Sequence, residues 1–165
     1  MTLCGACGFD WHLPPEHAME AIRTLPSSAV LALLTTDVAT SHRTDQWSAG
    51  AYVWHLADVL RISAERFYGV GLDPSIPVVP FDQDELAAAR RYELQRTDVA
   101  VRSLTWSVEE WLRVAATLDP DLPYLHPEFG ELTVSDGFRL VAHEVHHHLR
   151  DIELALGPGS IGRSG

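Results

Sequence analysis

Four of the nine histidines in this 165-residue chain fall within six positions, at His143, His146, His147 and His148. His143 and His147 are four residues apart, so on a helix they share a face with their Cβ atoms about 5–6 Å apart. Two imidazoles at this spacing can bind one metal ion at about 2.0–2.1 Å per bond. A solvated, histidine-rich helix end that binds no metal is the alternative explanation of the same residues.

The letters from His143 to His147 also match H-E-x-x-H, the motif of zinc proteases in which the glutamate is the general base. Such a protease takes its third ligand from further along the chain, and only 18 residues follow His147. Arg150 and Glu153 stand where the long form of the motif has glycine and histidine. The sequence therefore disfavours a protease.

His55 is the candidate for a third ligand, because it lies mid-way along a predicted helix, beside that helix's apolar stripe. A hydrogen bond inside the core would equally explain a single histidine there. Three nitrogen ligands would leave one coordination position open, as in catalytic zinc sites. Asp58 and Asp151 each follow a candidate ligand by one turn and could accept a hydrogen bond from its second nitrogen, or could be plain surface carboxylates. Arg61 and Arg66 could bind an anionic substrate or form surface ion pairs.

The N-terminal segment carries the only two cysteines of the chain, Cys4 and Cys7, and the spacing C-x2-C is common in zinc sites. His12 and His17 follow at intervals that resemble a zinc knuckle. There is no second C-x2-C, so three interpretations stay open. The cysteines could bind a second zinc ion, form a redox-active dithiol, or be reduced thiols that bind nothing.

The elements that must position these residues are predicted to be helices, because apolar residues recur every three or four positions. Helices are expected over residues 16–25, 29–35, 49–68, 82–92, 97–118 and 136–156, with Pro26 breaking or kinking the first. Ser48 and Ser135 are the predicted N-caps of the second long helix and the last one. Residues 36–46, 69–81 and 120–130 are expected to be loops. The pattern predicts an all-α fold, a four-helix bundle with short extra helices in its loops.

Residues 1–165 are expected to form a single domain, with an irregular segment at 1–13 and a mobile tail at 157–165. The formal net charge of −11 would repel nucleic acid and anionic membrane surfaces, so neither is an expected partner. No apolar run reaches the roughly 20 residues of a membrane helix. The first residues lack the pattern of a signal peptide, which predicts a cytoplasmic protein. A homodimer stays open.

Two segments resemble the DinB/YfiT-like superfamily: Trp47–Arg66, which contains His55-Leu-Ala-Asp58, and His143–Ile152. The resemblance spans most of the chain and implies a metal-binding four-helix bundle. By position it implies His55, His143 and His147 as the metal ligands. The known activities of the family imply transfer of mycothiol or bacillithiol to an electrophile, or mycothiol-dependent isomerisation of maleylpyruvate.

The chemistry of such a site agrees with thiol transfer. A divalent ion can hold a thiol as the nucleophilic thiolate near neutral pH, and it can instead activate water for hydrolysis. Zinc suits three nitrogens and a labile fourth ligand best, with nickel, manganese and iron as alternatives. The expected function is metal-dependent transfer of a small-molecule thiol to an electrophilic small molecule. A hydrolase or isomerase at the same site and a non-catalytic metal-binding bundle are the alternatives.

Overall fold

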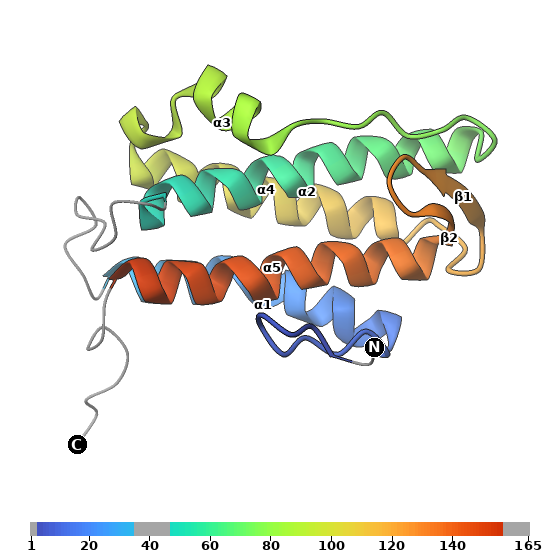
Figure 1. Cartoon of the computed structure of the whole chain (residues 1–165), viewed down its shortest axis with the longest axis horizontal. Helices are drawn as coiled ribbons and strands as arrows, with labels where there is room; N and C mark the ends of the chain where they lie inside the picture. The colour runs from blue at the N-terminus through green and yellow to red at the C-terminus, as the bar shows by residue number, and fades with distance from the viewer. Residues whose placement is uncertain (1–2, 35–46, 157–165) are drawn as a thin grey trace.

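The computed structural model describes residues 3–34 and 47–156, with the backbone alone for 29–34. Four long helices form a bundle, as Figure 1 shows: α1 (Pro15–Leu34), α2 (Ala49–Leu72), α4 (Thr97–Ala115) and α5 (Val134–Leu156). In the chain, the short helices α3 (Gln83–Arg90) and η1 (Tyr92–Leu94) follow α2 and precede α4. A hairpin of β1 (Pro123–His126) and β2 (Gly130–Thr133) precedes α5. The predicted four-helix bundle is confirmed, whereas the hairpin was expected to be a loop.

The order of the helices around the bundle differs from their order in the chain. α1 packs mainly against α5 and α4, and α2 packs mainly against α4 and α5. The segment that carries α3 runs back along the outside of the bundle, so α2 and α4 point in the same direction (Figure 1). This connectivity places α5 between α1 and α2. One face of α5 can therefore contact the N-terminal segment while another face contacts α2.

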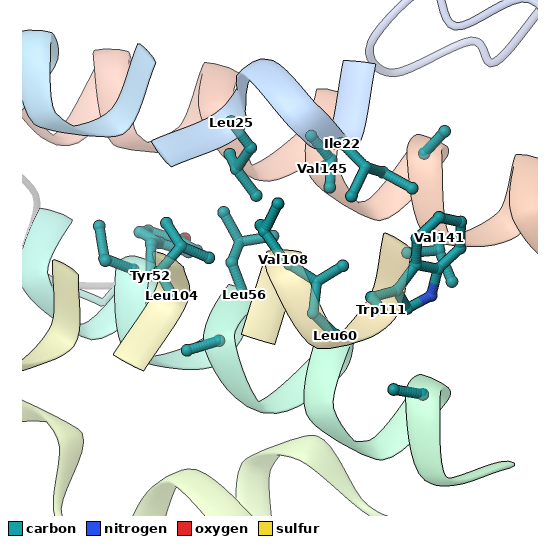
Figure 2. Close-up of a cluster of buried hydrophobic side chains, with 14 of the residues drawn as sticks. Ile22, Leu25, Tyr52, Leu56, Leu60, Leu104, Val108, Trp111, Val141 and Val145 are labelled. Atoms are coloured by element: carbon teal, nitrogen blue, oxygen red, sulfur yellow. The ribbon is translucent and has the colours of Figure 1, made fainter. Parts of the chain in front are cut away.

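Side chains from all four long helices meet in one core, which Figure 2 shows in close-up. Trp111 of α4 and Phe138 of α5 are its largest fully buried side chains, and their ring centroids are 5.1 Å apart. Gly137 lets the hairpin and α2 approach α5 closely. A Cβ atom at this position would lie 2.6 Å from the hydroxyl oxygen of Tyr124 and 2.9 Å from Cζ of Phe67.

Of the caps predicted for α2 and α5, the one at Ser48 is confirmed and the one at Ser135 is wrong. Ser48 caps α2, because its side chain accepts a hydrogen bond of 3.2 Å from the backbone N–H of Ala51. Ser135 does not cap α5, which begins one residue earlier, at Val134. Its N-terminus is a reciprocal capping box, in which the Thr133 hydroxyl accepts from the N–H of Asp136 and the Asp136 carboxylate accepts from the N–H of Thr133.

Several helix ends also differ from the prediction. α1 continues through Pro26, which removes one backbone N–H, and packing of this helix against α4 and α5 offsets that loss. α2 runs to Leu72, although Gly69 and Gly71 lie in its last turns. α4 ends at Ala115, and the predicted helix 82–92 is divided into α3 and η1.

The predicted loop 36–46 and tail 157–165 lie outside the described residues. Within the described part of the chain, no helix is long and apolar enough to cross a membrane.

Candidate metal centre

α5 carries two pairs of side chains that could bind a metal ion, and the second pair begins one residue after the first. His143 and His147 form one i, i+4 pair, and Glu144 and His148 form the next. Each residue turns a helix by about 100°, so the two pairs meet different neighbours. The structure groups Glu144 and His148 with His55 of α2, and it groups His143 and His147 with the N-terminal cysteines.

The first group, which we call the α2–α5 centre, consists of His55, Glu144 and His148. Its ligand atoms all lie within 4.8 Å of one another. His55 is only 1% exposed, and its Nε2 atom is buried without a hydrogen-bond partner in the described structure. The rings of His55 and His148 meet edge to face at 4.6 Å, and Nε2 of His148 lies 3.4 Å from a Glu144 carboxylate oxygen. Two imidazoles and a carboxylate thus converge on one point.

Two of the three side chains of the α2–α5 centre have the protonation state that a metal ligand needs. Burial, assisted by the nearby charge of His148, lowers the pKa of His55 to about 4, so this imidazole is neutral at pH 7. Burial by itself would raise the pKa of Glu144, but its hydrogen bond to His148 and the surrounding histidines outweigh burial and lower it. Burial by itself would lower the pKa of His148, and contacts with Glu144 and Asp151 raise it instead. Glu144 is therefore an ionised carboxylate and His55 a neutral imidazole, whereas the raised pKa of His148 favours its protonated form until a metal displaces the proton.

Neighbouring side chains fix the rings of the α2–α5 centre. Asp151 lies 2.9 Å from Nδ1 of His148 and can accept its proton, which leaves Nε2 facing Glu144. The sequence predicted instead that Asp151 would accept a hydrogen bond from His147. The Asp151 carboxylate lies 3.7 Å from Nε2 of His147, farther than from His148. Tyr52 stacks on His148 with ring centroids 5.4 Å apart, and Trp47 packs against His55 at 5.2 Å. The carboxylate–histidine pair is the kind of support that orients metal ligands.

The second group, the N-terminal cluster, consists of Cys4, Cys7, His143 and His147. Their ligand atoms also lie within 4.8 Å of one another. The structure therefore divides the three predicted ligands: His143 and His147 belong to this cluster, and His55 belongs to the α2–α5 centre. Sequence reasoning missed Glu144 and His148 as partners of His55, although they have the same four-residue spacing as the pair that it chose.

His12 and His17, which the sequence spacing suggested as companions of the cysteines, are both exposed. The described structure includes neither of them in a group that could hold a metal.

Asp58, the other predicted supporting carboxylate, is 2% exposed and has different partners. One of its oxygens accepts from Arg61 and Arg90, and the other accepts a hydrogen bond of 2.5 Å from the hydroxyl of Tyr92. This network ties α3 and η1 to α2. Asp58 is therefore placed to hold the outer segment on the bundle.

Replacing Asp58 with alanine is expected to lower the free energy of unfolding by about 2–3 kcal/mol, because buried Tyr92 and partly exposed Arg90 lose their acceptor. Urea unfolding followed by circular dichroism measures this effect. Asp98, whose exposed carboxylate pairs with Arg96 and Arg102, is the control, and Asp98→Ala should destabilise the protein far less than Asp58→Ala. Equal losses in the two variants would contradict the assigned role of Asp58.

A cleft of about 920 Å³ runs along the face formed by α2, the hairpin and α5. Glu144 and His143 line it, so it reaches both clusters of metal-binding side chains. Arg66 also lines the cleft and donates a hydrogen bond of 2.5 Å to the carbonyl oxygen of Val79. Its Nε atom is buried without a partner in the part of the chain that the structure describes, and burial lowers its pKa. The cleft thus offers an unpaired cationic donor on a largely apolar surface.

Comparison with known proteins places this arrangement in a family. A protein of Oceanobacillus iheyensis named "putative metal-dependent hydrolase" is 25% identical over 138 residues, which cover 81% of this chain and 79% of that protein. The solved structure of YfiT from Bacillus subtilis, described as "a probable metal-dependent hydrolase with an unusual four-helix bundle topology", matches with a TM-score of 0.73 at 20% identity. That match covers 84% of this chain and 83% of YfiT. The sequence model of the DinB superfamily matches residues 19–152, and the chain therefore belongs to the DinB superfamily.

Proposed function

We propose that this protein is a divalent-metal-dependent enzyme that transfers a low-molecular-weight, mycothiol-like thiol to an electrophilic small molecule. The α2–α5 centre would hold the metal. The observation that carries the proposal is the buried Nε2 atom of His55, which has no partner among the described residues, on a side chain that is grouped with Glu144 and His148. An unpaired buried polar atom costs about 1–3 kcal/mol, and a bound cation would remove that cost.

The donor set fits a catalytic metal. Two histidines and one glutamate bind zinc in known hydrolytic enzymes and leave a fourth position for a reactant. Zinc is the metal that we expect first, with nickel, manganese and iron as alternatives that also accept nitrogen and oxygen ligands. A divalent cation here would supply a Lewis acid that lowers the pKa of a thiol, or of water, at the open position.

The side chains around the centre orient the ligands and the reactants. Asp151 lies 2.9 Å from Nδ1 of His148, and by accepting a proton from that nitrogen it would leave Nε2 for the metal. Burial keeps His55 neutral, because an imidazolium would have to lose its hydration. Arg66 lies in the same cleft, where its unpaired Nε could bind a carboxylate of the thiol or of the electrophile.

The cleft has the size that a two-substrate reaction needs. Small-molecule sites usually measure about 300–1,000 Å³, and this cleft of about 920 Å³ lies near the upper end. It therefore has room for a thiol and an electrophile together. Apolar side chains that include Leu140 and Val141 line the cleft beside Glu144 and would strengthen the local electrostatic interactions.

Hydrolysis at the same centre is the second candidate function. It is favoured by the descriptions of the two similar proteins, both of which name a metal-dependent hydrolase. In that case the open position would take water, and Arg66 would bind an acidic group of the substrate.

The test is a reconstitution assay with metal-free protein. The protein is loaded with zinc, nickel, manganese or iron and incubated with cysteine, glutathione, mycothiol or bacillithiol and with monochlorobimane as the electrophile. Conjugation should be about 100-fold faster than with His55→Ala, because a direct metal ligand is lost in this variant. His146→Ala is the matched control, since His146 is exposed on α5 and lies outside both clusters.

The outcomes separate the candidates. Metal-dependent conjugation that His55→Ala loses and His146→Ala keeps would support thiol transfer. Hydrolysis of a panel of esters and amides, without conjugation, would overturn thiol transfer in favour of the second candidate. A loaded protein that catalyses neither reaction would overturn both candidates and leave a non-catalytic metal-binding bundle.

A further inference from the structure

We propose that Cys4, Cys7, His143 and His147 form a second zinc site, which is structural and fastens the N-terminal segment to α5. This site shares no ligand with the α2–α5 centre, although the two adjoin, because Nδ1 of His143 lies 3.5 Å from a Glu144 carboxylate oxygen. It does not depend on the proposed enzymatic activity.

The types and spacing of the four residues are those of a structural zinc site. Cys4 and Cys7 have the C-x2-C spacing, and His143 and His147 have the H-x3-H spacing, of the two halves of a zinc finger. Here the fold brings the two halves together from opposite ends of the chain. Two cysteines and two histidines fill all four positions of a tetrahedral zinc ion, so no position is left for a reactant.

The geometry is close to that of a bound site. With Zn–S bonds of about 2.3 Å and Zn–N bonds of about 2.0–2.1 Å, neighbouring ligand atoms lie about 3.3–3.8 Å apart. Sγ of Cys4 and Nε2 of His143 are already 3.3 Å apart. All four ligand atoms lie within 4.8 Å of one another. Small side-chain movements would therefore complete the tetrahedron.

The backbone around the cysteines forms a tight turn that brings both sulfur atoms to one side. The N–H of Gly8 donates to the carbonyl of Cys4, and the N–H of Cys4 donates to the carbonyl of Phe9, both at 2.8 Å. Gly8 has φ = 77°, a left-handed conformation that favours glycine.

The histidines are also held in place for a ligand. The ring of His143 stacks on Trp11 with centroids 4.6 Å apart, and Phe9 meets it edge-on at 5.5 Å. Nδ1 of His147 is buried and finds no hydrogen-bond partner among the residues described. Binding of zinc through this nitrogen would satisfy it. At the other end of the segment, Arg139 donates a hydrogen bond of 2.8 Å to the carbonyl of Leu13.

The first experiment counts zinc in the full-length, untagged protein purified under reducing conditions. Wild type and His146→Ala should contain about two zinc ions per chain, and Cys4→Ser/Cys7→Ser and His55→Ala should each contain about one. An unchanged zinc content in the double cysteine variant would overturn the proposal. The wild type could also contain a single zinc ion that is lost only in the double cysteine variant. That result would support this site and contradict the metal centre of the proposed function.

A second measurement needs no variant, so misfolding of a variant cannot obscure the result. X-ray absorption of the zinc-loaded wild type should show sulfur neighbours at about 2.3 Å. The cobalt-substituted protein should show thiolate-to-cobalt charge-transfer absorption, which His55→Ala should retain. Zinc with nitrogen and oxygen neighbours alone would overturn the proposal. An intact mass that is lower by two hydrogens, under the same reducing conditions, would also overturn it, because the cysteines would then form a disulfide.

Discussion

His148→Ala is expected to abolish metal binding at the α2–α5 centre, whereas His147→Ala should leave that centre loaded. In the proposed centre His148 is one of three ligands. Loss of a direct ligand should lower the metal affinity by more than about 100-fold, since loss of a supporting partner alone costs about 10–100-fold. Chelator competition measures the affinity. In the Cys4→Ser/Cys7→Ser background the measurement reports the α2–α5 centre alone.

The ligand set that the family resemblance implies makes the opposite prediction. If His55, His143 and His147 held the ion, His147→Ala would empty the centre and His148→Ala would spare it. His146→Ala, at an exposed position of the same helix, controls for general effects of substitutions in α5. Circular dichroism of each variant confirms that loss of metal is not loss of fold.

Trp111→Ala is expected to lower the free energy of unfolding by about 4 kcal/mol, the largest stability effect that we predict. Trp111 is fully buried and packs edge-on against Phe67 and Phe138, so its removal leaves a cavity between α2, α4 and α5. Its Nε1 atom has no hydrogen-bond partner in the described chain. Trp111→Phe should therefore cost only about 1–2 kcal/mol. The phenyl ring fills most of the space of the indole, and the substitution removes the unpaired N–H donor.

Urea unfolding provides the measurement, and Trp106 provides the matched control. Trp106 lies on the same helix but is 77% exposed, so Trp106→Ala should change stability by about 0.5 kcal/mol or less. Similar losses for Trp106→Ala and Trp111→Ala would contradict the described packing of α4.

The helices were predictable because each carries its own apolar stripe, and the cap at Ser48 was predictable from local chemistry. The hairpin was not, because its strands are four residues each and carry Pro123 and Gly130, which indicate a loop. The path of α1 through Pro26 depends on packing against helices that are distant in sequence. Periodicity does not contain that information.

The histidine cluster on α5 was visible from the sequence, but its division between two groups of side chains was not. The pairs His143/His147 and Glu144/His148 have the same spacing, so only the rotation of α5 against α2 decides which pair meets His55. That rotation is set by the packing of the whole bundle. The contact between Cys4 and His143 likewise joins the two ends of the chain, and local patterns cannot reveal it.

The most direct test of two separate sites is anomalous diffraction at the zinc edge from crystals of the zinc-loaded, full-length protein. Our account predicts one peak bonded to Nε2 of His55, Glu144 and His148, and a second peak among the two cysteines, His143 and His147. A single peak bonded to His55, His143 and His147 would contradict it.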